Sequence, residues 1–101
     1  MGEDVMKVDN EVTVSGLLHH IRSEKKSDKY FLFSIKQETP WSDGTIRKDF
    51  LVSRAFIPDV QEQVKALPEG TPLKVNGSLQ SSLGSGDMYI YAREVEMLQT
   101  S

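Results

Sequence analysis

A single stretch of helical period interrupts a sequence whose other apolar residues alternate as they do in β-strands. Val60, Val64 and Leu67 recur at positions i, i+4 and i+7, a spacing that places them on one face of a helix. Pro58 suits the first turn of a helix, and the proline that follows Leu67 cannot continue one. The pattern therefore predicts one short amphipathic helix over residues 58–67.

Three alternating segments precede this predicted helix. The first covers residues 11–21 and contains Gly16, where a half-buried strand could bend. The second covers residues 30–37, and the third covers residues 45–54. An Asp-Gly pair at positions 43–44 separates the second and third segments and is a typical hairpin turn. These segments predict three strands joined as a meander.

The second segment has one strongly apolar face. Phe31, Phe33 and Ile35 share a pleat face, whereas Tyr30 and Lys36 lie on the opposite face. Large apolar side chains that share a face are most often buried. We therefore expect the two phenylalanines and Ile35 to belong to the core, and Tyr30 and Lys36 to lie outside it.

Two further strands are predicted after the helix. Leu73, Val75 and Leu79 alternate within residues 72–79, and a Gly-Ser-Gly turn separates them from a last alternating segment at residues 88–98. Five strands with one helix between the third and fourth predict an all-β OB-fold, a five-stranded Greek-key barrel. A small SH3-like barrel and an α+β sheet covered by one helix are the alternatives.

The length and composition fit one domain. A chain of 101 residues builds a single hydrophobic core, and without cysteine it has neither disulfides nor cysteine-based zinc sites. We expect a flexible acidic lead-in at residues 1–10, the OB domain at residues 11–98 and a tail at residues 99–101. The acidic start is unlike a signal peptide, and no run of about 18 apolar residues occurs. These features favour a cytoplasmic protein.

The charge is distributed unevenly along the chain. The formal net charge is −3, which by itself disfavours binding to nucleic acid. Residues 19–54, however, contain eight basic and five acidic residues, a net charge of +3, whereas the remainder carries −6. This asymmetry is compatible with one face that attracts phosphates, and equally with an ordinary solvated surface.

The order and spacing of several short motifs resemble the bacterial single-stranded DNA-binding protein family, and especially its short primosomal members, the primosomal replication proteins N. The resemblance spans roughly residues 12–98. It rests on Val-Thr-Val-Ser-Gly-Leu-Leu at residues 12–18, the Phe-rich second strand, Arg-Lys-Asp-Phe at 47–50, Glu-Gly-Thr-Pro-Leu-Lys-Val-Asn-Gly-Ser-Leu at 69–79, and Ala-Arg-Glu-Val-Glu-Met-Leu at 92–98.

This resemblance implies roles for particular residues. It implies that Phe50 stacks on bases, that Arg47 contacts the DNA backbone, and that Lys25 and Lys26 of the first loop close over the strand. It also suggests a homodimer. The sequence departs from the family pattern in two places. Residues 81–87 contain no basic residue, and no acidic tail follows Leu98. We therefore expect weaker and more salt-sensitive binding, without recruitment of partners through a tail.

The side-chain chemistry supplies the rest of the candidate site. Aromatic rings offer stacking platforms for any unpaired base, and neighbouring cations neutralise phosphates. Trp41 either caps the barrel or stacks on a base, Tyr30 is either a platform or a cross-strand partner, and the parity of Phe50 fits core or surface. The candidate nucleic-acid-binding residues are Arg22, Lys25, Lys26, Tyr30, Lys36, Trp41, Arg47, Lys48, Phe50 and Arg54. We expect Trp41, Arg47 and Phe50 to gather on one concave side of the barrel.

Other functional classes lack the residues they need. The sequence contains no P-loop, nucleophile elbow, zinc-binding histidine pattern or dinucleotide fingerprint, so we expect neither an enzyme nor a cofactor. His19 and His20 are adjacent on a strand and therefore face opposite ways, which disfavours a metal site. Tyr89, Tyr91 and Arg93 share one face and could form a DNA contact, a dimer edge or a packing seam.

The favoured function is sequence-independent binding of single-stranded DNA during replication, replication restart or repair. The partners expected are single-stranded DNA, replication or primosome proteins and a second copy of the chain, with no membrane. The main alternative is an OB-fold subunit of a replication or telomere-type complex that binds proteins and little DNA. RNA binding in the manner of cold-shock domains ranks last, because base stacking alone does not sense the 2′-hydroxyl.

Overall fold

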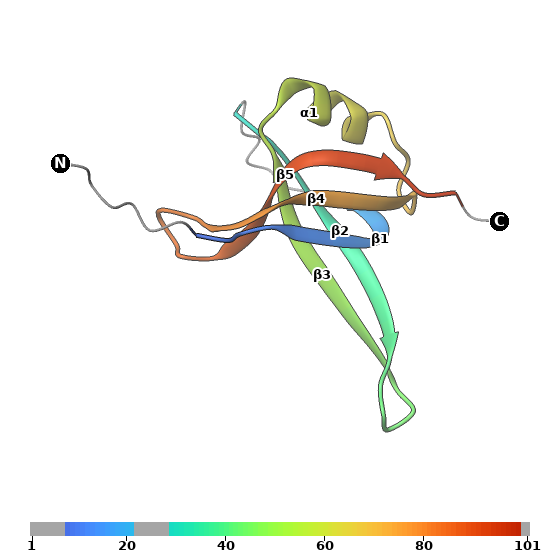
Figure 1. The fold of residues 1–101 in the computed structure, drawn as a ribbon. Helices are drawn as coiled ribbons and strands as arrows, with labels where there is room; N and C mark the ends of the chain where they lie inside the picture. The colour runs from blue at the N-terminus through green and yellow to red at the C-terminus, as the bar shows by residue number, and fades with distance from the viewer. Residues whose placement is uncertain (1–7, 22–28, 100–101) are drawn as a thin grey trace.

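The computed structural model describes residues 8–21 and 29–99. Its elements are β1 (Val12–His20), β2 (Phe31–Pro40), β3 (Ile46–Ala55), α1 (Pro58–Lys65), β4 (Pro72–Ser81) and β5 (Met88–Met97). The strands close into a barrel in the order β1-β2-β3-β5-β4, with α1 between β3 and β4 (Figure 1). This confirms the predicted OB-fold and excludes the two alternative folds.

Strand β1 closes the barrel by pairing with two neighbours. Its first part pairs with β4, from Val12 opposite Gly77 to Leu17 opposite Pro72, and its last part pairs with β2. Gly16 lies where β1 passes from one partner to the other. A Cβ atom there would collide with the carbonyl oxygen of Lys36 and lie 2.8 Å from Cγ2 of Ile35. The predicted bend at Gly16 is therefore also a point of close packing.

The hairpin of β2 and β3 extends beyond the barrel. The two strands pair from Phe31 opposite Ala55 to Pro40 opposite Ile46, whereas β1 follows β2 only as far as Lys36. The outer part of the hairpin is therefore a two-stranded ribbon, which projects away from the other strands (Figure 1). Both faces of this ribbon are accessible to a ligand.

The core lies inside the barrel and beneath α1. Phe33 and Ile35 are fully buried, as the sequence predicted. Val60 and Val64 of α1 are buried against the same cluster, while Leu67 packs on it beyond the end of the helix. The helix thus ends two residues earlier than its apolar period suggested, but it buries the predicted face.

The barrel closes through a short parallel contact between β3 and β5. Only Ser53 opposite Ile90 and Arg54 opposite Tyr91 form this ladder within the described residues. Strand β5 pairs along its whole length with β4, with an irregularity between Asn76 and Gly77. None of the described helices is long and apolar enough to cross a membrane.

Candidate nucleic-acid interface

A row of three side chains crosses the outer face of β1, β2 and β3. Leu17 lies opposite Lys36, and Lys36 in turn lies opposite Phe50. Phe50 is 50% exposed and Leu17 is 40% exposed, which is unusual for large apolar residues on central strands. An exposed ring beside a lysine is the arrangement that a nucleotide needs, because the ring stacks on the base and the ammonium meets the phosphate.

Phe50 also contacts a ring on β1. The ring centroids of His19 and Phe50 are 5.1 Å apart, and the ring planes are inclined at 61°. His19 lies one row further along the same face, opposite Ser34, which is itself opposite Val52. The exposed patch therefore contains two aromatic rings, a lysine and aliphatic side chains.

The basic residues of this face are partly neutralised. Nζ of Lys36 lies 3.0 Å from Oε1 of Glu38, and Lys48 is the cross-strand partner of Glu38. The hydrogen bond from Lys36 and its positive charge hold the pKa of the Glu38 carboxyl below its ordinary value, with a smaller contribution from Lys48. Phosphates would compete with this carboxylate for both lysines, so binding here should be sensitive to salt.

The hairpin ends in a hydrogen-bonded turn. Asp43 accepts hydrogen bonds from the backbone N–H (2.9 Å) and the hydroxyl (2.6 Å) of Thr45, and both lower the pKa of the Asp43 carboxyl. Gly44 takes a positive φ of 91°, which explains the predicted Asp-Gly signal. Trp41 begins this turn and is 50% exposed. It therefore lies far out on the ribbon, and the alternative that it caps the barrel is wrong.

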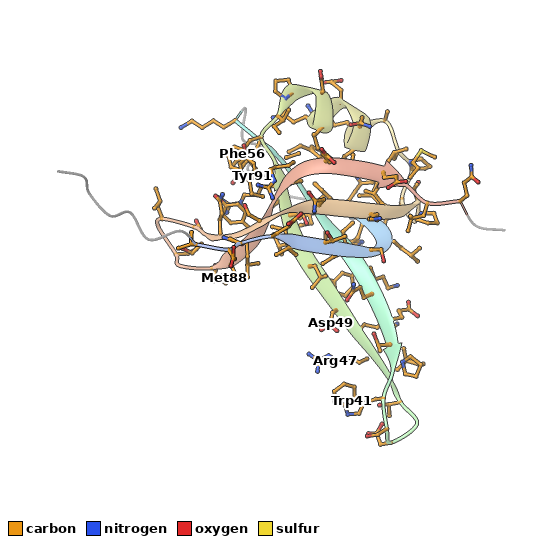
Figure 2. All side chains as sticks on the ribbon, in the orientation of Figure 1. Trp41, Arg47, Asp49, Phe56, Met88 and Tyr91 are labelled. Carbon is orange, nitrogen blue, oxygen red and sulfur yellow. The ribbon has the colours of Figure 1, made fainter. Side chains whose placement is uncertain are left out.

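Trp41 forms a second candidate contact with Arg47. The guanidinium carbon of Arg47 lies 5.2 Å from the centroid of the Trp41 ring, while Nε of the same arginine lies 3.1 Å from Oδ2 of Asp49. Trp41, Arg47 and Asp49 lie along the same side of the projecting hairpin (Figure 2). This is an exposed ring beside a cation, with a carboxylate as competitor.

The expectation that Trp41, Arg47 and Phe50 gather on one side is wrong. Successive residues of a strand point to opposite faces, so Arg47 and Phe50, three positions apart, project in opposite directions. Arg47 shares its face with Leu51, which packs against the core, whereas Phe50 shares its face with exposed Val52. A separation of three residues on one strand already predicts opposite faces. The roles implied by the family resemblance favoured the opposite expectation.

A third aromatic group surrounds Arg54 at the other end of β3. The guanidinium carbon lies 4.6 Å from the ring centroid of Tyr30 and 4.2 Å from that of Tyr89. Nε of Arg54 is buried and has no hydrogen-bond partner within the described residues. Tyr30 is thus a cross-strand packing partner in this structure, and Arg54 is held by rings rather than left free at the surface.

Phe56, which was not among the predicted site residues, completes this group. Its ring stacks on that of Tyr91, with the centroids 5.2 Å apart and an interplanar angle of 12° (Figure 2). Its centroid also lies 5.0 Å from that of the Tyr30 ring. Phe56 directly follows β3 and has the same parity as Phe50, so the alternation of β3 already indicated on which side it lies. The contact of Phe56 with Tyr91 could not be predicted from the sequence, because it depends on the parallel pairing of β3 with β5.

The comparisons with solved structures agree with this architecture. The structure resembles the dimeric N-terminal domain of PriB from Thermoanaerobacter tencongensis (22% identity, TM-score 0.60, 90% of this chain and 98% of that chain covered). It also resembles a small single-stranded DNA-binding protein from Mycoplasma pneumoniae (17% identity, TM-score 0.68, 93% of this chain and 99% of that chain covered). A third similar structure is the Plasmodium falciparum SSB complex with single-stranded DNA (19% identity, TM-score 0.68, 98% of this chain and 100% of that chain covered).

The chain has the fold of single-stranded DNA-binding proteins. The resemblance noted in the sequence is thereby supported over nearly the whole length of the chain. No protein-family model matches the sequence, and no curated protein matches it.

Within this OB-fold, the predicted site residues fall into separate groups. Lys36, Lys48 and Phe50 lie on the outer face of the hairpin, Trp41 and Arg47 lie on its other face, and Tyr30 and Arg54 lie in the aromatic group near β5. Arg22, Lys25 and Lys26 are outside the described residues. No group of three or more histidine or acidic residues in the described ranges could hold a metal ion.

Proposed function

We propose that this protein binds single-stranded DNA without sequence preference, as a non-enzymatic component of replication, replication restart or repair. The observation that carries the proposal is the row of Leu17, Lys36 and Phe50 across β1, β2 and β3, in which both apolar side chains are exposed and Lys36 is partly buried. This is the face with which OB-folds commonly bind oligonucleotides. The fold shared with proteins described as single-stranded DNA-binding supports the proposal.

The arrangement explains how a protein of net charge −3 could bind a polyanion. Stacking on Phe50 supplies affinity that does not depend on the base, and Lys36 and Lys48 supply local positive charge beside the ring. The neighbouring carboxylate of Glu38 weakens this charge. We therefore expect modest affinity that falls steeply as the salt concentration rises.

Titration of the full chain with a fluorescent oligo-dT at low and at moderate salt tests the proposal. We expect saturable binding at low salt that weakens at moderate salt. Titration with an RNA of the same length tests whether the ligand is DNA. Absence of binding to oligo-dT at low salt would refute single-stranded DNA binding.

An OB-fold protein-interaction subunit is the second candidate, and the β4–β5 hairpin favours it. Three apolar side chains are exposed there, those of Leu79, Leu83 and Met88. Residues 81–87 contain no basic residue. Light scattering after gel filtration measures the stoichiometry of the protein alone and of the protein with oligonucleotide. The homodimer, the replication or primosome partners and the cytoplasmic location remain predictions of this proposal.

A further inference from the structure

The loop after α1 is fixed against the end of β1 by its backbone. The N–H of Gly70 donates to the carbonyl of Leu18 (2.8 Å), and the N–H of Leu18 donates to the carbonyl of Thr71 (2.9 Å). Gly70 adopts a φ of +86°, which turns the chain at this point. The loop therefore holds the side chain of Glu69, which directly precedes Gly70, at a defined place beside β1.

Glu69 uses both carboxylate oxygens on two consecutive residues of β1. Oε1 accepts the backbone N–H of His20 at 2.7 Å, and Oε2 lies 2.9 Å from Nδ1 of His19. The hydrogen bond from the His20 backbone, followed by that from the His19 ring, lowers the pKa of the Glu69 carboxyl. Glu69 is consequently ionised at neutral pH and can only accept hydrogen bonds.

This contact fixes the tautomer of His19. Because the carboxylate carries no hydrogen, the hydrogen between Oε2 and Nδ1 belongs to the imidazole. In the neutral ring, Nε2 is then a hydrogen-bond acceptor. The side chain of His19 is 40% exposed, and no residue in the described ranges binds Nε2. Nε2 is therefore available to a ligand that offers a donor.

The angle between His19 and Phe50 determines how a base could use both rings. With the planes inclined at 61° and the centroids 5.1 Å apart, a base that stacks on one ring meets the other at a steep angle. Phe50 has no polar atom and suits stacking, whereas His19 can meet the polar edge of the same base. Phosphate oxygens are acceptors, so the neutral His19 ring is not suited to bind them.

We propose that His19 accepts a hydrogen bond at Nε2 from the base that stacks on Phe50, and that Glu69 is a positioning residue that holds His19 in the acceptor tautomer. This inference rests on the proposed function. The four DNA bases all carry an N–H donor, so the contact is compatible with sequence-independent binding. It would favour intact bases over bases whose N–H groups are blocked.

Two strands that differ in one group test this contact. Oligo-dT carries a donor at N3 of each thymine, and a strand of N3-methylthymidine lacks it but keeps the ring and the phosphates. At pH 8 we expect the wild-type protein to bind oligo-dT about two- to tenfold more tightly, the usual range for one neutral hydrogen bond. His19→Ala should abolish this preference. Lys36→Ala should weaken the binding of both strands and preserve the preference.

Glu69→Gln tests the positioning role. The amide oxygen of glutamine can keep the bond to the His20 backbone, which directs the NH₂ group towards Nδ1 of His19 and moves the ring hydrogen to Nε2. We expect the preference for oligo-dT to disappear. Nitrogen-15 NMR of the free protein reads the tautomer directly: we expect the hydrogen on Nδ1 in the wild type and on Nε2 in the variant.

Equal binding of the two strands by the wild type, or a preference that survives His19→Ala, would overturn the inference. A wild-type hydrogen on Nε2 at pH 8 would overturn it as well. Failure of the proposed function gives a different result, because the wild-type protein would then bind neither strand. The two failures are therefore distinguishable in one set of titrations.

Discussion

Arg47 and Phe50 project from opposite faces of β3, although only three residues separate them. Arg47 lies over the ring of Trp41, with its guanidinium carbon 5.2 Å from the ring centroid, whereas Phe50 contacts His19 of β1. Arg47 lies on the part of the hairpin that extends beyond the barrel (Figure 1), whereas Phe50 lies in the row where β1 still pairs with β2. A single strand that contacts both groups must therefore pass around the hairpin rather than along one face of it.

Phe50→Ala should weaken binding of oligo-dT by about 5- to 150-fold, the factor that corresponds to ~1–3 kcal/mol for stacking on one base. The ring is half exposed, so its removal should cost the fold little. Fluorescence anisotropy measures the affinity. Met97→Ala is the control, because it removes another exposed apolar side chain, on β5, and should leave the affinity unchanged. An equal effect of the two variants would refute a stacking role for Phe50.

Trp41→Ala and Phe50→Ala should act independently if the strand contacts both faces. Effects at distant sites without shared contacts usually add within about 0.5 kcal/mol. We therefore expect the double variant to lose the sum of the two single losses in binding free energy. A double loss much smaller than that sum would mean that one nucleotide bridges the two rings. That result would contradict the separation of the two faces.

Arg47→Ala should flatten the dependence of binding on salt. One phosphate contact to single-stranded DNA contributes about 0.7 to the slope of log affinity against log salt concentration. Asp49 lies 3.1 Å from Nε of Arg47 and competes with the phosphate for this cation. Asp49→Asn should therefore tighten binding at low salt, with Arg47 still present. An unaltered slope in Arg47→Ala would remove this residue from the backbone contacts.

Arg54→Ala should destabilise the barrel rather than act only on binding. Its guanidinium lies between Tyr30 and Tyr89, where the parallel contact of β3 with β5 is only two residue pairs long. We expect a loss of about 1–2 kcal/mol in the free energy of unfolding, the range for a partly desolvated cation–π contact. Urea denaturation measures it. Arg54→Lys keeps the charge and should lose less; an unchanged midpoint in Arg54→Ala would contradict the packing role.

The barrel itself could be predicted because its strands alternate and its helix does not. Phe33, Ile35, Val60 and Val64 are buried in the structure, and their periods are visible in the sequence. The outer hairpin was harder to predict, since β2 continues through residues 38–40 without any apolar period. A ribbon beyond the core buries no face, so it leaves no pattern of alternating apolar residues.

The composition of the candidate site could be predicted only in part. Phe50 and Lys36 were proposed from chemistry and resemblance, and the structure places them opposite each other. His19 and Phe56 were not among the predicted nucleic-acid-binding residues, because each packs against rings at least 26 positions away in sequence. Such contacts follow from the closure of the barrel, so local alternation indicates only the face on which a side chain lies.

Gly16→Ala should destabilise the protein by about 1–3 kcal/mol, the usual cost of overpacking a close contact. The added methyl group would meet the backbone oxygen of Lys36, which can move only by separating β1 from β2. Gly84→Ala is a matched control, because a Cβ atom at Gly84 meets nothing within 4 Å. Thermal unfolding measures both variants. Similar melting temperatures for the two would contradict the close packing at Gly16.

The Glu69 carboxyl should titrate below 4.5, its ordinary pKa, because the ionised form accepts hydrogen bonds from the His20 backbone and the His19 ring. A pKa that is lower in the folded than in the unfolded state contributes stability above the unfolded value, and this stability is lost as the pH falls through the folded value. The bonds of Glu69 should therefore stabilise the end of β1 at neutral pH and weaken under acid conditions. Carbon-13 NMR of the carboxyl group measures the titration directly. His19→Ala should raise the pKa of Glu69 towards 4.5 without reaching it, since the larger effect, the backbone bond from His20, remains. An unshifted wild-type pKa would contradict the two hydrogen bonds that Glu69 accepts from His20 and His19.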